Sequence, residues 1–479
     1  MTSIARALVL LAAPLTVLGA ASCGSSDDGT PAPDGGTTNG TDGGDASLPP
    51  GADAGKTDSD AGTGSDAVAD ARSDGSAFAC APHAAIPEIK YWGGPILTAA
   101  EIVTITYDAM DPAVRKAVED FGDTCTQTEW WDVTMKDYCD KNGKCIGHGK
   151  SGGHVVLNET PDAKVTYTDS QDPAGSRTIV KFIQDHIDSG QFPAPNDQTL
   201  YSIFFPQTVT ITLDGTPSCQ GFGGYHFAAD LTPKGGGAIV RAAYAVMPSC
   251  RQGTPDVVTR SLIGVASHEY IEAATDAKSL GPEIRNADWG YYMEDPSWGI
   301  LFSGQEVGDL CPYPSSKIGT QRVTRGWLRH PPACSNPCGP ADPADLYFGA
   351  APARQVIELA VGESADVEVV AFSEKPMADW EVSVDEPSRG AFGGTGYGGH
   401  LEVSLSGGTA VDGGASSNTV KVNNGTKLTM HVKLLSAPPE DANYPSQTNV
   451  RYHHVFASLD ALLDANTGFS WPFTVRQKP

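Results

Sequence analysis

The spacing of apolar residues divides the chain after residue 80 into two regions of different character. In the first region, apolar and polar residues alternate over Glu101–Asp108, which predicts a strand, and segment 199–213 predicts a strand, a turn and a strand. Three further segments carry apolar residues three and four positions apart, the spacing of an amphipathic helix. This mixture predicts an α/β (α+β) domain over residues 80–338. The predicted helices cover 111–125, 176–190 with Ser176 as its cap and Gly190 at its end, and 255–276.

The second region has only the period-two pattern of strands. Beyond a proline-rich break at 331–345, short alternating segments are separated by glycine-rich turns, which predicts an all-β sandwich over residues 339–479. The pattern points to an immunoglobulin-like fold, although the Cys–Trp–Cys signature is absent because no cysteine follows Cys338. Such modules are more often spacers or binding units than catalysts, and in the second case the ligand is an extracellular protein or a polysaccharide. The predicted strands lie within 355–372, 380–387, 400–408, 418–435 and 469–477.

The first residues have the layout of a bacterial secretion signal. A basic residue is followed by the apolar run 7–18 and by small residues before Cys23. Because the cysteine follows the small residues directly, residues 1–22 resemble a lipoprotein signal, after whose removal Cys23 is acylated and anchors the protein to a membrane. A conventional signal peptide with an incidental cysteine has the same layout. Both alternatives predict export. By analogy with lipoprotein sorting rules, glycine rather than aspartate at position 24 favours the outer membrane or cell surface.

Residues 23–79 have the composition of a disordered tether. Between residues 24 and 79 there are 11 aspartates against Lys56 and Arg72, in a background of Gly, Ser, Thr, Ala and Pro. So few apolar residues cannot offset the entropy lost when a chain becomes ordered. The tether contributes to the net charge of −26, and this acidic character without a basic stripe argues against nucleic acid as a partner.

The cysteines fit an oxidising compartment. Nine remain after Cys23, so at least one has no partner within the folded chain. The loop DKNGK is turn-like and lies between two of them, where a local disulfide can close it. Connectivity cannot be derived from the sequence alone. The reasonable pairs are Cys139 with Cys145, Cys219 with Cys250, and Cys311 with Cys334 or Cys338.

The predicted helix 255–276 contains HEYIE, one residue away from the HExxH helix that holds zinc in many metallopeptidases. Residues four apart project from one face of a helix, so His268 and Glu272 present an imidazole and a carboxylate suited to one metal ion. Glu269 takes the place of the general base that activates a metal-bound water. Asp276, one turn further, is a candidate ligand or orients one. Taken alone the pattern is weak, and an amphipathic helix with a solvated acidic face is the simpler interpretation.

A catalytic zinc site needs a third protein ligand from elsewhere in the chain. The segment SGQEVGDLC supplies Glu306 and Asp309, and the segment GFGGYHF supplies His226. A core role is the simpler interpretation of His226, as it is of the paired Trp130 and Trp131. The sequence therefore offers two carboxylates and one histidine as candidates.

Six segments occur in a characteristic order: YWGGPILTAAEIVTITYD, EWWDVTMKDYCDKNGK, PAPNDQTLYSIFFPQTVTITLDGTPSCQGFGGYH, YAVMPSC, VASHEYIEAATD and QEVGDLC. Together, over roughly residues 88–335, they resemble the bacterial relatives of the EXORDIUM (phosphate-induced) family of secreted plant proteins. That family shows a YxGG start, a paired-tryptophan helix, a C…GYH…YA block, an HExxE helix followed by T[DN], and an E[IV]xDLC segment. The chain departs from it at Ala277, where proline is usual, and near Phe222, where a second cysteine is usual. The resemblance places His268, Glu269 and Glu272 on HExxE, Asp276 on T[DN], and Glu306 and Asp309 on E[IV]xD.

The resemblance implies a zincin-like domain with a metal site, in which Glu306 is the first choice for the third ligand and Asp309 the second. One histidine with two carboxylates is a harder ligand set than two histidines with a glutamate, so zinc is the first choice while Ca²⁺ and Mn²⁺ also fit. We therefore predict a surface-tethered, metal-dependent hydrolase of the peptidase type, with Glu269 as general base. The alternative is a non-catalytic cell-surface binding or adhesion protein whose metal, where present, is structural.

Overall fold

The computed structural model describes the chain from Phe78 to Lys478 with gaps. The predicted signal peptide, Cys23 and almost all of the predicted tether lie outside the described residues. Among the described residues, no helix combines the length and apolar character needed to cross a membrane. The described residues are 78–158, 167–170, 176–277, 289–295, 297–299, 304–311, 315–386, 399–411, 418–437, 454–463 and 466–478.

A five-stranded sheet forms the centre of the N-terminal region, which mixes helices and strands as predicted. Its order is β3-β2-β5-β9-β8, and all neighbours are parallel except β8 and β9. The predicted strand at Glu101–Asp108 is confirmed as β2, and 199–213 contains two strands as expected, although they belong to different sheets. The strands of the central sheet are β2 (Glu101–Tyr107), β3 (Lys150–Leu157), β5 (Thr199–Phe205), β8 (Tyr225–Leu231) and β9 (Val240–Pro248).

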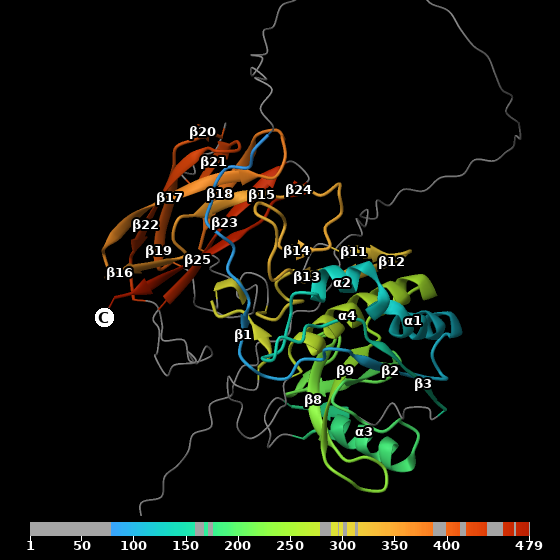
Figure 1. Cartoon of the computed structure of the whole chain (residues 1–479). Helices are drawn as coiled ribbons and strands as arrows, with labels where there is room; N and C mark the ends of the chain where they lie inside the picture. The colour runs from blue at the N-terminus through green and yellow to red at the C-terminus, as the bar shows by residue number, and fades with distance from the viewer. Residues whose placement is uncertain are drawn as a thin grey trace, which may run out of the picture. The chain divides into compact units, whose positions relative to one another are not determined.

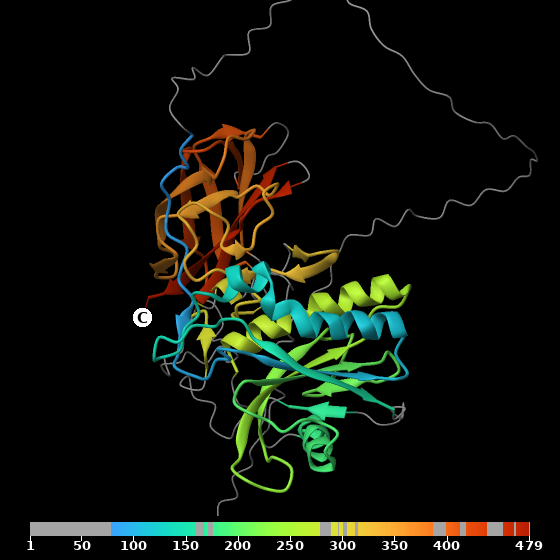
Figure 2. The same ribbon diagram turned by 45° about the vertical axis from the view of Figure 1, so that its right-hand side comes forward.

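Helices lie on both faces of this sheet. α1 and α4 are side by side on one face and α3 is on the other, as Figure 1 and Figure 2 show from two directions. Asp111 caps α1, since its carboxylate accepts hydrogen bonds from the amides of Ala113 and Val114. The helices are α1 (Pro112–Thr124), the 3₁₀ turn η1 (Cys125–Gln127), α2 (Glu129–Met135), α3 (Thr178–Ser189) and α4 (Pro255–Thr275).

The start of α3 differs from the prediction. The helix begins at Thr178, and Arg177 rather than Ser176 occupies the cap position, without a side-chain capping bond. The hydroxyl of Ser176 instead lies 2.9 Å from that of Thr168. Ser176 therefore does not cap the helix. The end of α3 is as predicted, because Gly190 adopts a φ of 83°, which a glycine reaches without strain.

α4 is buried over its second half. Every residue from Val265 to Thr275 is buried, because the helix contacts α1 on one side, β8 and β9 on another, and strand β12 (Gln321–Thr324) on a third. An amphipathic helix with a solvated acidic face is therefore excluded. The charged residues of this half need partners inside the protein.

The C-terminal region is largely β-structure, as predicted. It contains a four-stranded sheet of order β15-β17-β22-β19 and a seven-stranded sheet of order β16-β25-β23-β18-β21-β20, in which β24 also pairs with β23. Neighbouring strands are antiparallel except β16 and β25, which are parallel. The strands are β15 (Phe348–Pro352), β16 (Val356–Leu359), β17 (Ser364–Ser373), β18 (Trp380–Asp385), β19 (Leu401–Ser406), β20 (Thr409–Ala410), β21 (Thr419–Val422), β22 (Lys427–Leu434), β23 (His454–Leu463), β24 (Asn466–Thr467) and β25 (Trp471–Gln477).

Small sheets connect the longer elements. They pair β1 with β10, β11 with β12, β13 with β14, and β4 with β6 and β7. The first of them joins the start of the folded chain to the segment that follows α4. Their remaining strands are β1 (Lys90–Tyr91), β4 (Tyr167–Asp169), β6 (Ile211–Leu213), β7 (Thr216–Pro217), β10 (Tyr291–Tyr292), β11 (Ser315–Ile318), β13 (Gly326–Trp327) and β14 (Cys338–Gly339).

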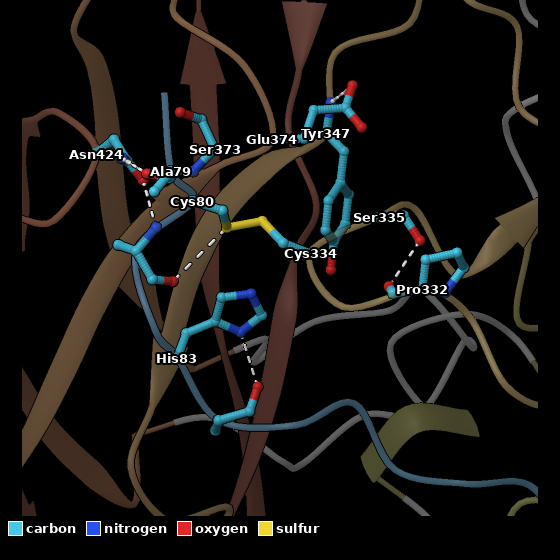
Figure 3. Close-up of a disulfide and its surroundings, with 12 residues drawn as sticks. Ala79, Cys80, His83, Pro332, Cys334, Ser335, Tyr347, Ser373, Glu374 and Asn424 are labelled. Atoms are coloured by element: carbon cyan, nitrogen blue, oxygen red, sulfur yellow. Dashed lines mark hydrogen bonds between the residues drawn. A yellow bond between two sulfur atoms is a disulfide. The ribbon is translucent and has the colours of Figure 1, made fainter. Parts of the chain in front are cut away.

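The described residues contain four disulfides, which are consistent with an extracellular protein. Two expected pairs are confirmed, and Cys311 bonds to Cys338, which was one of its two expected partners. Cys334 bonds instead to Cys80, a pair 254 residues apart that the sequence did not indicate (Figure 3). Among the cysteines that the structure describes, Cys125 has no disulfide partner and is buried. The four bonds are Cys80–Cys334, Cys139–Cys145, Cys219–Cys250 and Cys311–Cys338.

Candidate metal centre

The residues of HEYIE lie on the buried half of α4. One turn separates His268 from Glu272, so their side chains share a face, and His268 Nε2 lies 3.1 Å from Glu272 Oε1. Both side chains and that of Glu269 are at least nine-tenths buried. The helix therefore places an imidazole and two carboxylates inside the protein, where each needs a counter-charge.

His226 reaches the same place from β8, the antiparallel strand at one end of the central sheet. Its Nδ1 lies 3.2 Å from Glu269 Oε2 and 3.4 Å from Glu272 Oε2. Its Nε2 lies 3.9 Å from Glu306 Oε1. This position corrects the expectation of a core role for His226, which is buried but among carboxylates. Trp130 and Trp131, by contrast, are buried core residues as expected.

The turn segment 304–311 brings the remaining two carboxylates. Asp309 Oδ1 lies 3.5 Å from His268 Nε2, and the Asp309 amide donates a hydrogen bond to Glu272 Oε1 at 3.1 Å. The Glu306 amide donates to Asp309 Oδ2. Gly308 permits this approach, because a Cβ there would lie 2.9 Å from both Glu272 Oε1 and His268 Nδ1.

These residues form two groups that can each hold a metal ion. One group is His268, Glu272 and Asp309, and the other is His226, Glu272 and Glu306. Within each group, one ligand atom per residue lies within 4.8 Å of the others. Ligands about 2.0–2.2 Å from a zinc ion are at most about 4.4 Å apart, so either group needs only a small contraction to bind. Glu272 belongs to both.

The charge of the cluster favours a cation. His226, His268 and the four carboxylates Glu269, Glu272, Glu306 and Asp309 carry a net charge of −2 even when both imidazoles are protonated. A buried excess of negative charge costs free energy. It is removed either by protonation of the carboxylates or by a bound cation. Solvent reaches the cluster beside Glu306 and Asp309, whose side chains are 15% and 16% exposed.

The acid–base properties of the cluster reflect this crowding. Burial alone lowers the pKa of His226, but the charges and hydrogen bonds of Glu306, Glu269 and Glu272 outweigh it and raise that pKa well above its usual value. Burial raises the pKa of Glu269. Burial and the negative charge of Glu272 raise the pKa of Asp309 to about 7. Two carboxyl groups of the cluster therefore take up protons more readily than usual.

Glu272 behaves in the opposite way. Burial acts to raise its pKa, but the charge of His268 and the hydrogen bonds of both imidazoles hold that pKa below its usual value. Glu272 is thus the carboxylate that stays ionised at the centre of the cluster.

Asp276 lies at the C-terminal cap of α4 and belongs to neither group. Its Oδ1 accepts a hydrogen bond from the Gly290 amide at 2.9 Å. The carboxylate is fully buried and joins the end of the helix to the segment that leads to β10. The structure thus gives Asp276 a structural contact, one turn beyond Glu272.

A third cluster, Cys80, His83 and Cys334, has the composition of a metal site but not its chemistry. The two sulfurs are bonded to each other, as Figure 3 shows, so neither is a thiolate ligand. His83 Nδ1 lies 2.7 Å from the Ala84 carbonyl, and its ring stacks on Phe372 with ring centroids 3.8 Å apart. This cluster is a structural cross-link.

Comparison with models of known protein families and with curated protein sequences found no match. The geometry of the metal-binding residues is therefore the basis for assigning a function. The sequence named the α4 residues and both carboxylates of 304–311 as candidates, and the structure brings them together. The residue grouped with His268 and Glu272 is Asp309, the second choice, whereas the first choice, Glu306, is grouped with His226. Asp276 and the weight given to His226 also differ from expectation. The GYH segment contains no periodic signal that distinguishes a site histidine from a core histidine.

Proposed function

We propose that the protein is an exported, surface-tethered, metal-dependent hydrolase that acts on peptide bonds. The observation that carries this proposal is the buried cluster of two histidines and four carboxylates, which has more negative charge than its own imidazoles can balance. The cluster is open to solvent on the side of Glu306 and Asp309. The partial exposure of these two side chains is consistent with a metal site that water can reach.

His268, Glu272 and Asp309 hold the ion in this proposal, with Glu306 on the neighbouring side. Zinc is the first choice, and manganese or calcium also suits a ligand set so rich in carboxylates. When bound, the ion supplies Lewis acidity and lowers the pKa of water. The Asp309 amide donates to Glu272 Oε1 and so fixes the orientation of the shared carboxylate.

Glu269 is the general base of the proposed reaction. It belongs to neither ligand group, and its raised pKa brings it closer to the pH of operation, where a base is most effective. His226 Nδ1, 3.2 Å from its Oε2, holds the carboxylate in place. Glu269 takes a proton from the water whose oxygen attacks the peptide carbonyl carbon. The same proton then passes to the nitrogen of the leaving amine as the C–N bond breaks.

The cellular context rests on the sequence. The signal layout and Cys23 support a lipoprotein at the bacterial outer membrane or cell surface. The six sequence segments that resemble the EXORDIUM family, in the same order along the chain, support a zincin-like N-terminal domain. The two sheets of the C-terminal region support an immunoglobulin-like sandwich that binds an extracellular protein or polysaccharide.

The test is hydrolysis of a denatured protein substrate by the purified chain, before and after treatment with a chelator. We expect cleavage that is lost on chelation, restored by zinc or manganese, and absent in His268→Ala. Bound metal without cleavage of any peptide would contradict the enzymatic part of the proposal. It would favour the alternative, a surface-binding protein with a structural metal.

A further inference from the structure

The two oxygens of Glu272 face different histidines. Oε1 lies 3.1 Å from His268 Nε2 and accepts the Asp309 amide, whereas Oε2 lies 3.4 Å from His226 Nδ1. A carboxylate that serves a single metal ion has no need of a second imidazole on its other oxygen. A carboxylate with a histidine on each side is arranged as a bridge.

His226 provides a second, independent observation. Its side chain is 3% exposed, and among the described residues its Nε2 has no hydrogen-bond partner. A buried polar atom without a partner loses its hydration and gains nothing in return. This Nε2 is directed toward Glu306, whose Oε1 is 3.9 Å away, a separation too long for a hydrogen bond. Ligand atoms about 2.0–2.2 Å from one zinc ion are at most about 4.4 Å apart, so this separation allows Nε2 and Glu306 Oε1 to bind the same ion.

We propose that the protein binds two divalent cations bridged by Glu272. His268, Asp309 and Glu272 Oε1 hold the first ion, and His226, Glu306 and Glu272 Oε2 hold the second. The inference deepens the proposed function and rests on it, since the first ion is the one already assigned. Each ion then has one imidazole and two carboxylates, so the two sites have the same ligand chemistry and accept the same metal, zinc or manganese.

The charge of the cluster favours two bound ions over one. Histidines that bind a metal are neutral, so the six residues of the cluster then carry four negative charges from Glu269, Glu272, Glu306 and Asp309. When all four carboxylates are ionised, one divalent ion leaves two of these charges unbalanced in a buried site, and two divalent ions balance all four. Paired ions about 3.5–4 Å apart are a recurring arrangement in aminopeptidases and phosphatases.

The arrangement also assigns different roles to the residues around the bridge. His226 is a ligand of the second ion, and its contact with Glu269 orients the general base. Glu306, on the solvent-exposed side, completes the second site from the turn segment. Loss of the second ion is therefore expected to leave the first bound, because His268 and Asp309 lie on the opposite side of Glu272.

The test is the metal content of the full chain, measured by elemental mass spectrometry after reconstitution with zinc and removal of free metal. We expect two zinc ions per chain in the wild type, one in His226→Ala, one in Glu306→Gln, one in His268→Ala and none in Glu272→Gln. His154→Ala, an exposed histidine paired with Asp123, is the matched control and is expected to keep both ions. Reconstitution with Mn²⁺ gives a second readout. The two bridged ions of the wild type are expected to be magnetically coupled, whereas the single ion of Glu306→Gln has no partner and shows no coupling.

Glu306→Gln keeps the test valid where the buried His226→Ala variant fails to fold, because Glu306 is partly exposed. One zinc ion in the wild type that persists in both His226→Ala and Glu306→Gln would overturn the second site and leave the proposed function intact. No zinc or manganese in the wild type would overturn the proposed function itself, and the second site with it.

Discussion

The imidazole of His226 lies 3.2 Å from the carboxylate of Glu269, although 43 residues separate them in the chain. The contact exists because β8 runs antiparallel beside β9, next to the buried half of α4. A helix alone supplies one histidine and two glutamates. The neighbouring strand adds the second histidine, and the turn segment 304–311 adds the carboxylates that complete the cluster.

Replacing Glu269 with glutamine tests the proposed general base. The amide keeps the shape and the contact with His226 but cannot accept the proton from water. We expect kcat to fall by about 10²–10⁴-fold, while metal content is unchanged because Glu269 belongs to neither ligand group. Steady-state kinetics and elemental analysis of the same sample measure both. Glu368→Gln, on an exposed face of β17, is the control; equal activity in both variants would remove Glu269 from the mechanism.

Metal binding is expected to stabilise the fold. The cation offsets buried negative charge and binds the native state only, so a free metal concentration 100 times the Kd adds about 2.7 kcal/mol to the free energy of unfolding. Differential scanning calorimetry of metal-free and zinc-loaded protein is the measurement. The Tm of wild type is expected to rise with zinc and that of Glu272→Gln to stay constant. A rise of the same size in both proteins would place the stabilising ion elsewhere.

The close approach at Gly308 predicts that an added methyl group weakens metal binding. The Cβ in Gly308→Ala would lie 2.9 Å from Glu272 Oε1 and His268 Nδ1, so the turn segment or the ligands must shift. Loss of the partners that orient metal ligands typically costs about 10–100-fold in metal affinity. We expect a loss of that size in Gly308→Ala, and competition with a chromogenic chelator measures it. Gly264→Ala on α4, where a Cβ meets nothing within 4 Å, is the matched control with unchanged affinity. Equal affinities in the two variants would show that the segment does not position the ligands.

The sequence predicted the features that local interactions determine, and it did not predict those that depend on contacts between distant parts of the chain. Local patterns predicted α4 and the pairing of His268 with Glu272, because helical periodicity alone decides them. The contribution of His226 depends on the order of strands in the sheet, which no local pattern encodes. The bond between Cys80 and Cys334 depends in the same way on a contact across 254 residues. In the C-terminal region, strands β15, β20, β23 and β24 lie outside the segments predicted from alternation.

A buried group away from the metal site gives a pH prediction. Burial raises the pKa of Asp169, although Tyr244, Arg177 and Tyr225 act in the opposite direction. A folded-state pKa above the unfolded value means that this contribution to stability is fully present below about 3.9 and is lost as the pH rises through the folded pKa. We expect the stability of wild type relative to Asp169→Asn to increase as the pH falls toward 4. Urea unfolding of both proteins across that range measures the difference, and a constant difference would contradict the assignment.

The Cys80–Cys334 disulfide is expected to contribute strongly to stability. It closes a loop of 254 residues, and Asn424 holds the same end of the chain through hydrogen bonds to Ala79 and Ala81. Removing a native disulfide from a secreted domain typically costs about 2–5 kcal/mol. Denaturant unfolding of the Cys80→Ser/Cys334→Ser double variant measures the loss. The double variant Cys139→Ser/Cys145→Ser, whose loop spans a separation of only 6 residues, is expected to lose less; the reverse order would contradict the loop-length argument.

The central claim is that the buried cluster around Glu272 binds a divalent metal ion. Isothermal titration of zinc into the metal-free full chain, with wild type beside Glu272→Gln, tests it most directly. The account predicts saturable binding by wild type and none at this site in the variant, which keeps the fold but loses the carboxylate shared by both ligand groups. Absence of binding in wild type, for zinc, manganese and calcium alike, or equal binding by the two proteins, would contradict it.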